Sequence, residues 1–312
     1  MLPDEFVQRL YDIYPHSRNI LSSFSEPHPT AFRINTLRSP AASSLQSLRE
    51  EGIELQPVRW FDEAFWVPEH ARPALLSSSA YEKKWIYIQN LSSMVPVLAL
   101  APEPGERILD LAAAPGSKTL QIACRLNNVG EIAAVEVVKK RFFKLRDNLS
   151  RHGATCVKTF FRDGTTVWRH RPEYFDRILL DAPCSSEGRF RTTDPETFAY
   201  WSLRKIKEMA NKQKRLIYSA FQSLRPGGII VYSTCSFAPE ENESIIHHLV
   251  KKFGDAVEIE KIDLDIDAFH PPLKEWKGRM FSPALSSARR IIPDGVMEGF
   301  FICRLRKTAS TY

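Results

Sequence analysis

Long apolar runs are absent from this sequence of 312 residues. A membrane-spanning helix needs about 18 or more consecutive apolar residues, so we expect no membrane association. The N-terminus is acidic and has no basic segment followed by an apolar one, so we expect no secretion and a cytoplasmic location. A hydrophobic fraction of 43% and a charged fraction of 26% are typical of a globular protein with a sizeable core.

Cysteine pairs with the spacing of disulfide frameworks or metal sites are also absent. The five cysteines are an odd number, and the chain contains neither a Cys-x-x-Cys nor a His-x-x-x-His pair. We therefore predict no disulfide framework and no bound metal. A small buried side chain is the simplest interpretation of three cysteines, Cys124, Cys156 and Cys303.

Two nucleotide-binding patterns are missing or incomplete. The dinucleotide fingerprint Gly-x-Gly-x-x-Gly does not occur, which argues against a small-molecule dehydrogenase. The phosphate-binding P-loop is incomplete, because Leu111 occupies its first glycine position and Ser117 separates Gly116 from Lys118.

Positive charge is in excess, with a net charge of +6 and a pI near 9.0. This excess favours a polyanionic partner such as RNA. Lysines and arginines cluster within residues 139–146 and 204–215, although each cluster has the simpler interpretation of a solvated helix face.

The chain divides into two regions with different patterns near residue 80. The first region is rich in proline and serine and contains short helical and strand-like segments, at residues 6–14, 32–37 and 44–51. Residues 68–79 are predicted to be a linker. We predict a small α+β domain over residues 1–80 and a second domain over residues 81–312.

The second region alternates short apolar strands with helices. Strands are predicted at residues 107–111, 132–135, 158–161, 177–180 and 229–232, and helices at 117–126, 138–150, 203–224 and 240–253. This alternation predicts an α/β domain with a parallel sheet and helices on both faces. Ligands bind such sheets at the carboxyl ends of the strands.

A loop of small residues, Ala112–Lys118, follows the first of these strands. Small side chains let the backbone approach a ligand closely, and the amides at the next helix N-terminus face the same space. Glu136 ends the second strand, where an acid can accept ribose hydroxyls, and Asp163 ends the third, where it can accept an adenine amino group. The small-residue loop and these two acids together predict a pocket for adenosine. The alternative interpretation of the loop is a tight strand-to-helix turn that binds no ligand.

Two cysteines follow strand ends on the same edge of the predicted sheet. Cys184 lies in the segment Asp181–Ser186, and Cys235 lies in Ser233–Ser236. A thiolate that adds to C6 of a pyrimidine makes C5 nucleophilic enough to accept a methyl group. Asp181 is a candidate for contacting N3 of the base during that addition.

At these residues the sequence resembles the Nop2/Sun (Fmu-type) family of RNA cytosine-5 methyltransferases. The resemblance covers residues 30–307 and rests on several motifs, which are Phe32–Thr36, Gln89–Ser93, Ala113–Thr119, Phe175–Ser185, Ser233–Ser236, Pro239–Asn242 and Gly299–Lys307. It departs from the family at a few positions: alanine stands at Ala112 where cysteine is frequent, serine at Ser117 and Ser186 where glycine is common, and glutamate at Glu136 where aspartate is common. None of these departures removes a catalytic atom.

The resemblance implies a Rossmann-like class I methyltransferase domain with a mostly parallel seven-stranded sheet, preceded by a small RNA-recognition-like domain. It implies that Cys235 is the nucleophile and that Cys184 assists product release. The cofactor is then S-adenosyl-L-methionine, bound by Ala112, Ala113, Ala114, Pro115, Gly116, Ser117, Lys118, Glu136, Asp163 and Asp181. The partner is then an rRNA or tRNA, with predicted RNA contacts at Arg33, Asn35, Arg189 and Arg191.

A stacked base is out of reach for this chemistry, so we predict a flipped or single-stranded cytidine. Phe190 and Trp201 are candidates for stacking on bases, with ordinary loop packing as the alternative. A methyltransferase that acts on an exocyclic amine is disfavoured, because Asp181–Cys184 replaces the Asn/Asp-Pro-Pro-Tyr/Phe motif of such enzymes. A non-catalytic RNA-binding or ribosome-assembly factor is the main alternative. A single chain with both cofactor and base sites needs no partner subunit, so we expect a monomer.

Overall fold

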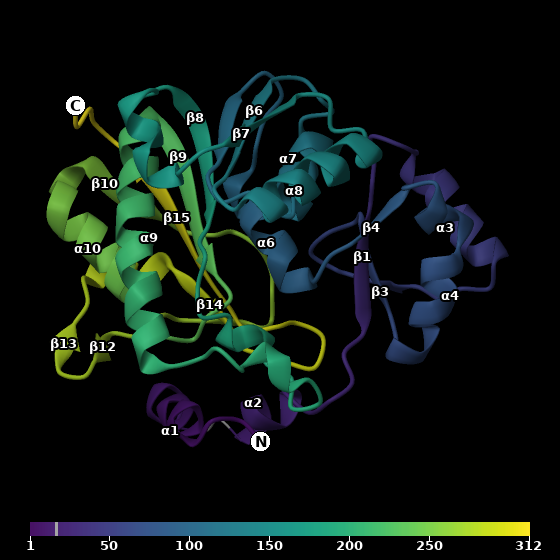
Figure 1. The fold of residues 1–312 in the computed structure, drawn as a ribbon, viewed down its shortest axis with the longest axis horizontal. Helices are drawn as coiled ribbons and strands as arrows, with labels where there is room; N and C mark the ends of the chain where they lie inside the picture. The colour runs from purple at the N-terminus through teal and green to yellow at the C-terminus, as the bar shows by residue number, and fades with distance from the viewer. Residues whose placement is uncertain (16–17) are drawn as a thin grey trace.

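The computed structural model describes residues 1–15 and 18–312. Within these residues the structure has a four-stranded sheet in the N-terminal part and a nine-stranded sheet in the rest of the chain (Figure 1). No helix in the described part of the chain combines the length and the apolar character that crossing a membrane requires.

The smaller sheet is antiparallel, in the order β2-β3-β1-β4. Its strands are β1 (Thr30–Ile34), β2 (Gln56–Pro57), β3 (Ala64–Val67) and β4 (Ile86–Ile88), and the helices beside them are α3 (Ala41–Glu50), α4 (Arg72–Ser77) and α5 (Ser79–Glu82). Phe32, Leu48 and Leu75 belong to one apolar cluster, so α3 and α4 pack on this sheet. The predicted α+β character of the N-terminal region is confirmed.

The linker prediction for residues 68–79 is wrong, because the segment is helical. It contains the 3-10 turn η1 (Glu69–Ala71) and the whole of α4. Leu75 is fully buried, and the Ser78 hydroxyl accepts a hydrogen bond from the Tyr81 amide as the N-cap of α5. Burial and capping therefore outweigh the proline- and serine-rich composition. Since β4 pairs with β1, the smaller sheet extends past the predicted domain division, which stays a prediction.

The larger sheet has the order β11-β14-β15-β9-β8-β5-β6-β7, and β10 also pairs with β15. Its strands are β5 (Arg107–Asp110), β6 (Glu131–Glu136), β7 (Val157–Phe161), β8 (Phe175–Asp181), β9 (Leu224–Thr234), β10 (Val257–Glu260), β11 (Phe269–His270), β14 (Arg289–Ile291) and β15 (Phe300–Lys307). Strands β5 to β9 pair in parallel, and the other four pair antiparallel. The predicted α/β class is confirmed, with the short β10 and β11 added to the seven strands expected.

Helices cover both faces of this sheet (Figure 1). One face packs against α6 (Leu91–Leu100), α7 (Ser117–Arg125) and α8 (Lys139–His152), and the other against α9 (Leu203–Ser223) and α10 (Glu243–Phe253). Successive side chains of β9 point to opposite faces of the sheet. Val231 therefore packs in the core beneath α6 to α8, and Ile230 packs in the core beneath α9 and α10. The helix predicted over residues 240–253 begins three residues later than expected.

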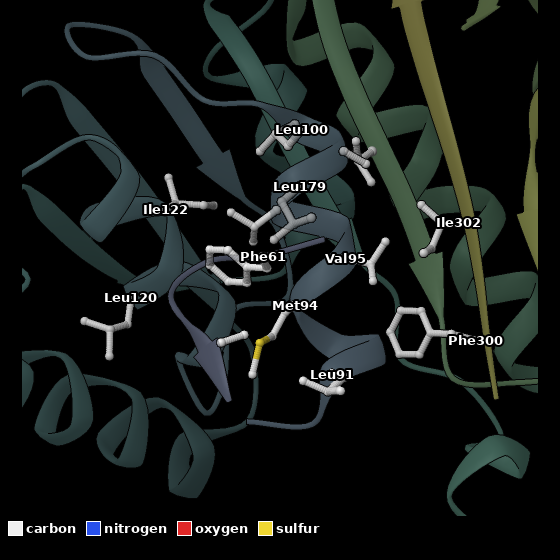
Figure 2. Packing of buried hydrophobic residues seen from close by; sticks show 14 of the residues in the cluster. Phe61, Leu91, Met94, Val95, Leu100, Leu120, Ile122, Leu179, Phe300 and Ile302 are labelled. Carbon is white, nitrogen blue, oxygen red and sulfur yellow. The ribbon is translucent and has the colours of Figure 1, made fainter. Parts of the chain in front are cut away.

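Helix α6 joins the two sheets into one packed body (Figure 2). This helix is apolar on nearly all sides, which is typical of a fully buried helix. Met94 of α6 shares a core with Phe61 of the N-terminal region and with Leu120 and Leu179 of the larger unit. The N-terminal region therefore has a fixed position relative to the larger sheet.

The first helices of the chain lie against the larger unit as well. Helix α1 (Asp4–Ile13), with its predicted apolar face, packs with Phe190 and Phe237, which follow β8 and β9. The remaining short elements are α2 (Arg18–Ser23), η2 (Gly164–Arg169), η3 (Glu187–Arg189), η4 (Pro195–Thr197), η5 (Gly254–Ala256), η6 (Pro283–Ser287), β12 (Glu275–Trp276) and β13 (Arg279–Met280).

Candidate active site

A cavity of about 530 Å³ opens at the carboxyl ends of β5, β8 and β9. This volume is within the range of small-molecule sites. Eight of the predicted cofactor and catalytic residues line it, which are Ala112, Ala114, Pro115, Ser117, Lys118, Asp181, Cys184 and Cys235, together with Arg189 from the predicted RNA contacts. The α6 N-terminus and the loop before β15 complete its wall.

The loop between β5 and α7 is held by one buried acid and one glycine. Asp110 accepts a hydrogen bond of 2.7 Å from the Thr119 hydroxyl, and burial raises the pKa of Asp110 to about 7. Gly116 has a φ of 104°, and a Cβ at this position would lie 3.0 Å from the Leu145 side chain in α8. Glycine at this position therefore allows the small-residue loop to pack closely against α8.

Asp181 is fixed by contacts on both of its carboxylate oxygens. The Lys118 ammonium donates to one oxygen at 2.7 Å, and the Ser233 hydroxyl donates to the other at 2.9 Å. Lys118 also donates to the Ser93 hydroxyl at 2.7 Å and is nearly buried, with 8% of its side chain exposed. These contacts hold the carboxylate at the wall of the cavity.

The two cysteine sulfurs lie 3.4 Å apart. They meet because β8 and β9 are parallel neighbours with Asp181 opposite Ser233, so the two loops leave the sheet side by side. A hydrogen bond from the Cys184 thiol lowers the pKa of Cys235, although burial opposes this effect. The same contact, with burial, raises the pKa of Cys184 well above its usual range. Cys235 is therefore the sulfur that ionises more readily.

Arg189 adds to this asymmetry. Its positive charge lowers the pKa of Cys235, after the larger effects of the Cys184 hydrogen bond and burial. About 65% of its side chain is exposed, and its guanidinium lies 3.8 Å from the Glu298 carboxylate. Arg191 binds the same carboxylate at 3.0 Å and is more enclosed.

The acids that end β6 and β7 do not line the cavity. Glu136 is 4% exposed and accepts a hydrogen bond of 2.8 Å from the Val138 amide. Asp163 is exposed, accepts a hydrogen bond of 2.9 Å from the Thr165 amide, and lines a separate hollow. The structure therefore gathers the β5, β8 and β9 residues of the predicted site and leaves these two acids apart.

Two of the predicted RNA contacts are wrong. Arg33 is 1% exposed and donates to Gln89 at 3.0 Å, and its guanidinium also reaches α7. Asn35 is fully buried and donates to the Lys84 and His152 carbonyls. Both side chains tie the smaller sheet to the larger unit and present no surface to RNA.

The stacking prediction is wrong for one of its two aromatic residues. Phe190 is fully buried in the cluster beneath α1 and cannot stack on a base. Trp201 is half-buried, and its indole N–H donates to Glu187 at 2.8 Å.

Two acids near the cysteines were missed by sequence reasoning. Glu187 and Glu241 are both buried and lie behind the two sulfurs. Glu241 falls within the Pro239–Asn242 motif, but glutamate is mostly exposed in proteins. Its burial depends on a contact with Ser185, 56 residues earlier in the chain, which no local pattern reveals.

Comparison with known families assigns both parts of the chain. Residues 97–306 match the family described as 16S rRNA methyltransferase RsmB/F. Residues 2–91 match the N-terminal domain of 16S rRNA methyltransferase RsmF. One relative, the ribosomal RNA small subunit methyltransferase F of Pectobacterium carotovorum, is 40% identical over 99% of this chain. The chain spans 63% of that relative's length.

Two solved structures from Pyrococcus horikoshii share the fold. A methyltransferase homolog protein has a TM-score of 0.84 and 34% identity, over 98% of this chain and 95% of its own. A structure of NSun6 with SFG has a TM-score of 0.83 and 23% identity, over 99% of both chains, and supports the fold alone. The resemblance seen in the motifs is confirmed, and the chain belongs to the RsmB/F family of methyltransferases.

Proposed function

We propose that this chain is an RNA cytosine-5 methyltransferase that transfers a methyl group from S-adenosyl-L-methionine through a covalent bond between Cys235 and C6 of the base. The observation that carries the proposal is the pair of sulfurs 3.4 Å apart beside the small-residue loop. A single cysteine has many explanations. Two adjacent thiols in an open cavity fit a reaction that needs one sulfur to attack the base and the other to accept the C5 proton.

The residues of the cavity fit S-adenosyl-L-methionine. The alanines of the loop leave space beside the α7 N-terminus, and the cavity reaches from this loop to the cysteines. We propose that Ala112–Lys118, Glu136 and Asp181 hold the cofactor, which supplies an electrophilic methyl group. Glu136 lies outside this cavity and Asp163 lines a neighbouring hollow, so the proposed contacts of these two acids with the cofactor rest on the sequence alone.

The reaction begins at Cys235. Its thiolate adds to C6 of the cytidine, and the electron pair of the C5–C6 double bond then forms the new bond from C5 to the methyl carbon, for which S-adenosyl-L-homocysteine would be the leaving group. Asp181 faces the same cavity from its contacts with Lys118 and Ser233, and we assign it the contact with N3 of the base.

Release of the product uses the second thiol. While Cys235 is free, its hydrogen bond and its charge keep the proton on Cys184. Once Cys235 is bonded to carbon, both effects disappear and Cys184 becomes easier to ionise. Once Cys184 has lost its own proton to solvent, its thiolate is placed to take the C5 proton, and the C6–sulfur bond breaks as the double bond forms again and Cys235 leaves as a thiolate.

The proposed substrate is a flipped or single-stranded cytidine in RNA of the small ribosomal subunit. The name of the Pectobacterium carotovorum relative and the descriptions of both matching families support ribosomal RNA over tRNA. Arg189 is the predicted RNA contact that remains exposed at the mouth of the cavity. Nothing in the described residues favours the non-catalytic alternative.

The test compares wild type, Cys235→Ala and Cys184→Ala on ribosomal RNA with a radiolabelled methyl donor and nucleoside analysis. We expect 5-methylcytidine from wild type, none from Cys235→Ala, and a protein–RNA adduct that persists with Cys184→Ala. Label on another base, or full activity of Cys235→Ala, would contradict the proposal.

A further inference from the structure

Two buried carboxyl groups lie behind the cysteines and have no role in the mechanism above. Glu187 belongs to η3, after the Cys184 loop, and is 2% exposed. Glu241 lies between the Cys235 loop and α10 and is fully buried. A buried carboxyl group without a cationic partner is costly, so its position calls for an explanation.

Glu241 holds the residue that follows each cysteine. Its carboxylate accepts hydrogen bonds from the Ser185 amide at 3.0 Å and from the Ser185 hydroxyl. It also lies 3.1 Å from the Ser236 hydroxyl. Because Ser185 follows Cys184 and Ser236 follows Cys235, this one side chain connects the two loops that carry the sulfurs.

A glutamine from α9 strengthens the same connection. The Gln213 amide donates to the Glu241 carboxylate at 2.8 Å and to the Pro183 carbonyl at 2.9 Å. Glu241 therefore holds the chain on both sides of Cys184, through Gln213 at Pro183 and directly at Ser185.

Glu187 holds the Cys235 loop from the other side. Its carboxylate accepts hydrogen bonds from the Phe237 amide at 2.9 Å and from the Trp201 indole at 2.8 Å. The Ser236 hydroxyl is 3.1 Å from the carboxylates of both Glu187 and Glu241. A hydroxyl has one proton, so it donates to only one of them at a time.

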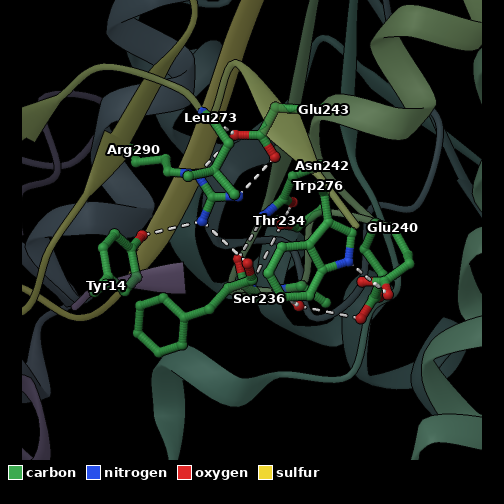
Figure 3. Close-up of polar contacts among 12 residues, drawn as sticks. Tyr14, Thr234, Ser236, Glu240, Asn242, Glu243, Leu273, Trp276 and Arg290 are labelled. Atoms are coloured by element: carbon green, nitrogen blue, oxygen red, sulfur yellow. Dashed lines mark hydrogen bonds and ion pairs between the residues drawn. The ribbon is translucent and has the colours of Figure 1, made fainter. Parts of the chain in front are cut away.

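The sequence neighbours of Glu241 are neutralised differently. Glu243 pairs with Arg290 at 2.6 Å, and Glu240 pairs with Arg9 at 2.8 Å. Figure 3 shows Glu243 and Glu240 on separate groups of contacts, with Arg290 between Glu243 and Tyr14. Among the described residues, neither Glu187 nor Glu241 forms an ion pair, so this pair differs from the arginine-paired acids beside it.

The charge of Glu241 acts on Cys184. Burial and the nearby Glu187 raise the pKa of Glu241 to about 7, and burial raises the pKa of Glu187, although Arg9 opposes this. After the Cys235 contact and burial, the charge of Glu241 also raises the pKa of Cys184. The other ionisable groups that face the pair are Tyr232, whose pKa Glu241 raises, and Tyr14, whose pKa Glu187 raises, in both cases after burial.

We propose that Glu241, with Glu187, is a positioning pair that fixes the two cysteine loops and keeps the shared thiol proton on Cys184, leaving Cys235 as the nucleophile. The inference rests on the proposed function, because it explains why one of two adjacent cysteines attacks the base. Neither glutamate lines the cavity that contains the sulfurs, so both act through the loops that carry the cysteines.

Alkylation by iodoacetamide, followed by peptide mass spectrometry, measures each thiol separately and needs neither RNA nor cofactor. In wild type we expect Cys235 to react faster than Cys184. Glu241→Gln keeps the size and removes the charge, so the ratio of the two rates should fall about tenfold, the equivalent of one pKa unit. The matched control is Glu240→Gln, which loses the ion pair with Arg9. It should keep the wild-type ratio of the Cys235 and Cys184 alkylation rates and the wild-type pH dependence of those rates.

A folded Glu241→Gln variant with the wild-type ratio would overturn the proposal, and so would an equal fall in Glu240→Gln. If Glu241→Gln does not fold, Ser236→Ala, which removes the bridging hydroxyl, takes its place. A lower ratio in Ser236→Ala supports the proposal, and an unchanged ratio overturns it. Absence of methyl transfer by wild type would contradict the proposed function and leave this measurement unaffected.

Discussion

The two ends of the candidate site differ in how completely their polar groups are held. At the β8–β9 end, Asp181 has a partner on each oxygen and the two cysteine sulfurs contact each other. At the β6–β7 end, Glu136 accepts a hydrogen bond from the Val138 amide and lies 3.6 Å from the Arg141 guanidinium, and Asp163 is exposed. The groups proposed to make and break bonds are therefore preorganised by close side-chain contacts, whereas the acids at the proposed adenosine end are held more loosely.

We expect the largest loss of methyl transfer from a change at Lys118, at the β8–β9 end. Lys118→Met removes a nearly buried cation and leaves Asp181 with one partner. We expect methyl transfer to fall about 100-fold, because a displaced catalytic group costs that much. The folded state should also lose about 1–3 kcal/mol of stability from the unpaired acid. Single-turnover rates and denaturant unfolding measure the two effects.

The double variant Lys118→Met/Asp181→Asn separates these effects. Removing both charges should restore most of the stability, because no unpaired ion remains, but should not restore the rate. A double variant with wild-type activity would show that Asp181 has no part in the reaction.

A smaller effect is expected at the open end of the site. Glu136→Ala should weaken cofactor binding about tenfold, the equivalent of one lost charge-assisted hydrogen bond. It should leave the alkylation rate of Cys235 unchanged, because Glu136 lies outside the cavity that contains the sulfurs. Calorimetry with S-adenosyl-L-methionine and alkylation of the same sample give both values. Unchanged affinity would remove Glu136 from the proposed cofactor site.

The smallest effect is expected at Arg189. Its charge helps to lower the pKa of Cys235, but most of its side chain is exposed and therefore screened by solvent. Arg189→Gln should raise the pH at which Cys235 reacts and slow alkylation about twofold to threefold near neutral pH. High salt should slow wild type toward the variant. A variant that matches wild type at low salt would contradict an electrostatic role.

Local sequence patterns predicted the parts of the fold that depend on local physics. Apolar runs with strand or helix periodicity located β5 to β9 and α7 to α9 to within a few residues. The position of each cysteine just past a strand end placed both at one edge of the sheet, because parallel strands end at the same edge. The pairing of β8 with β9 then brought the two sulfurs together.

The errors arose where long-range packing decides the environment of a residue. Arg33 and Asn35 have polar side chains that suit RNA, but their hydrogen bonds to segments 49 or more residues away bury them. Phe190 resembled an exposed loop aromatic, yet α1 folds back over it. Glu241 is buried for the same reason, because it accepts a hydrogen bond from Ser185, which is 56 residues earlier in the chain.

The central claim is the covalent bond between Cys235 and the base. The most direct measurement incubates wild type with cofactor and RNA that contains 5-fluorocytidine, whose C5 fluorine cannot leave as a proton does, and maps the trapped adduct by peptide mass spectrometry. We expect a stable protein–RNA adduct on Cys235 that is absent with Cys235→Ala. An adduct on Cys184, or methyl transfer to normal RNA with no adduct to the fluorinated RNA, would contradict it.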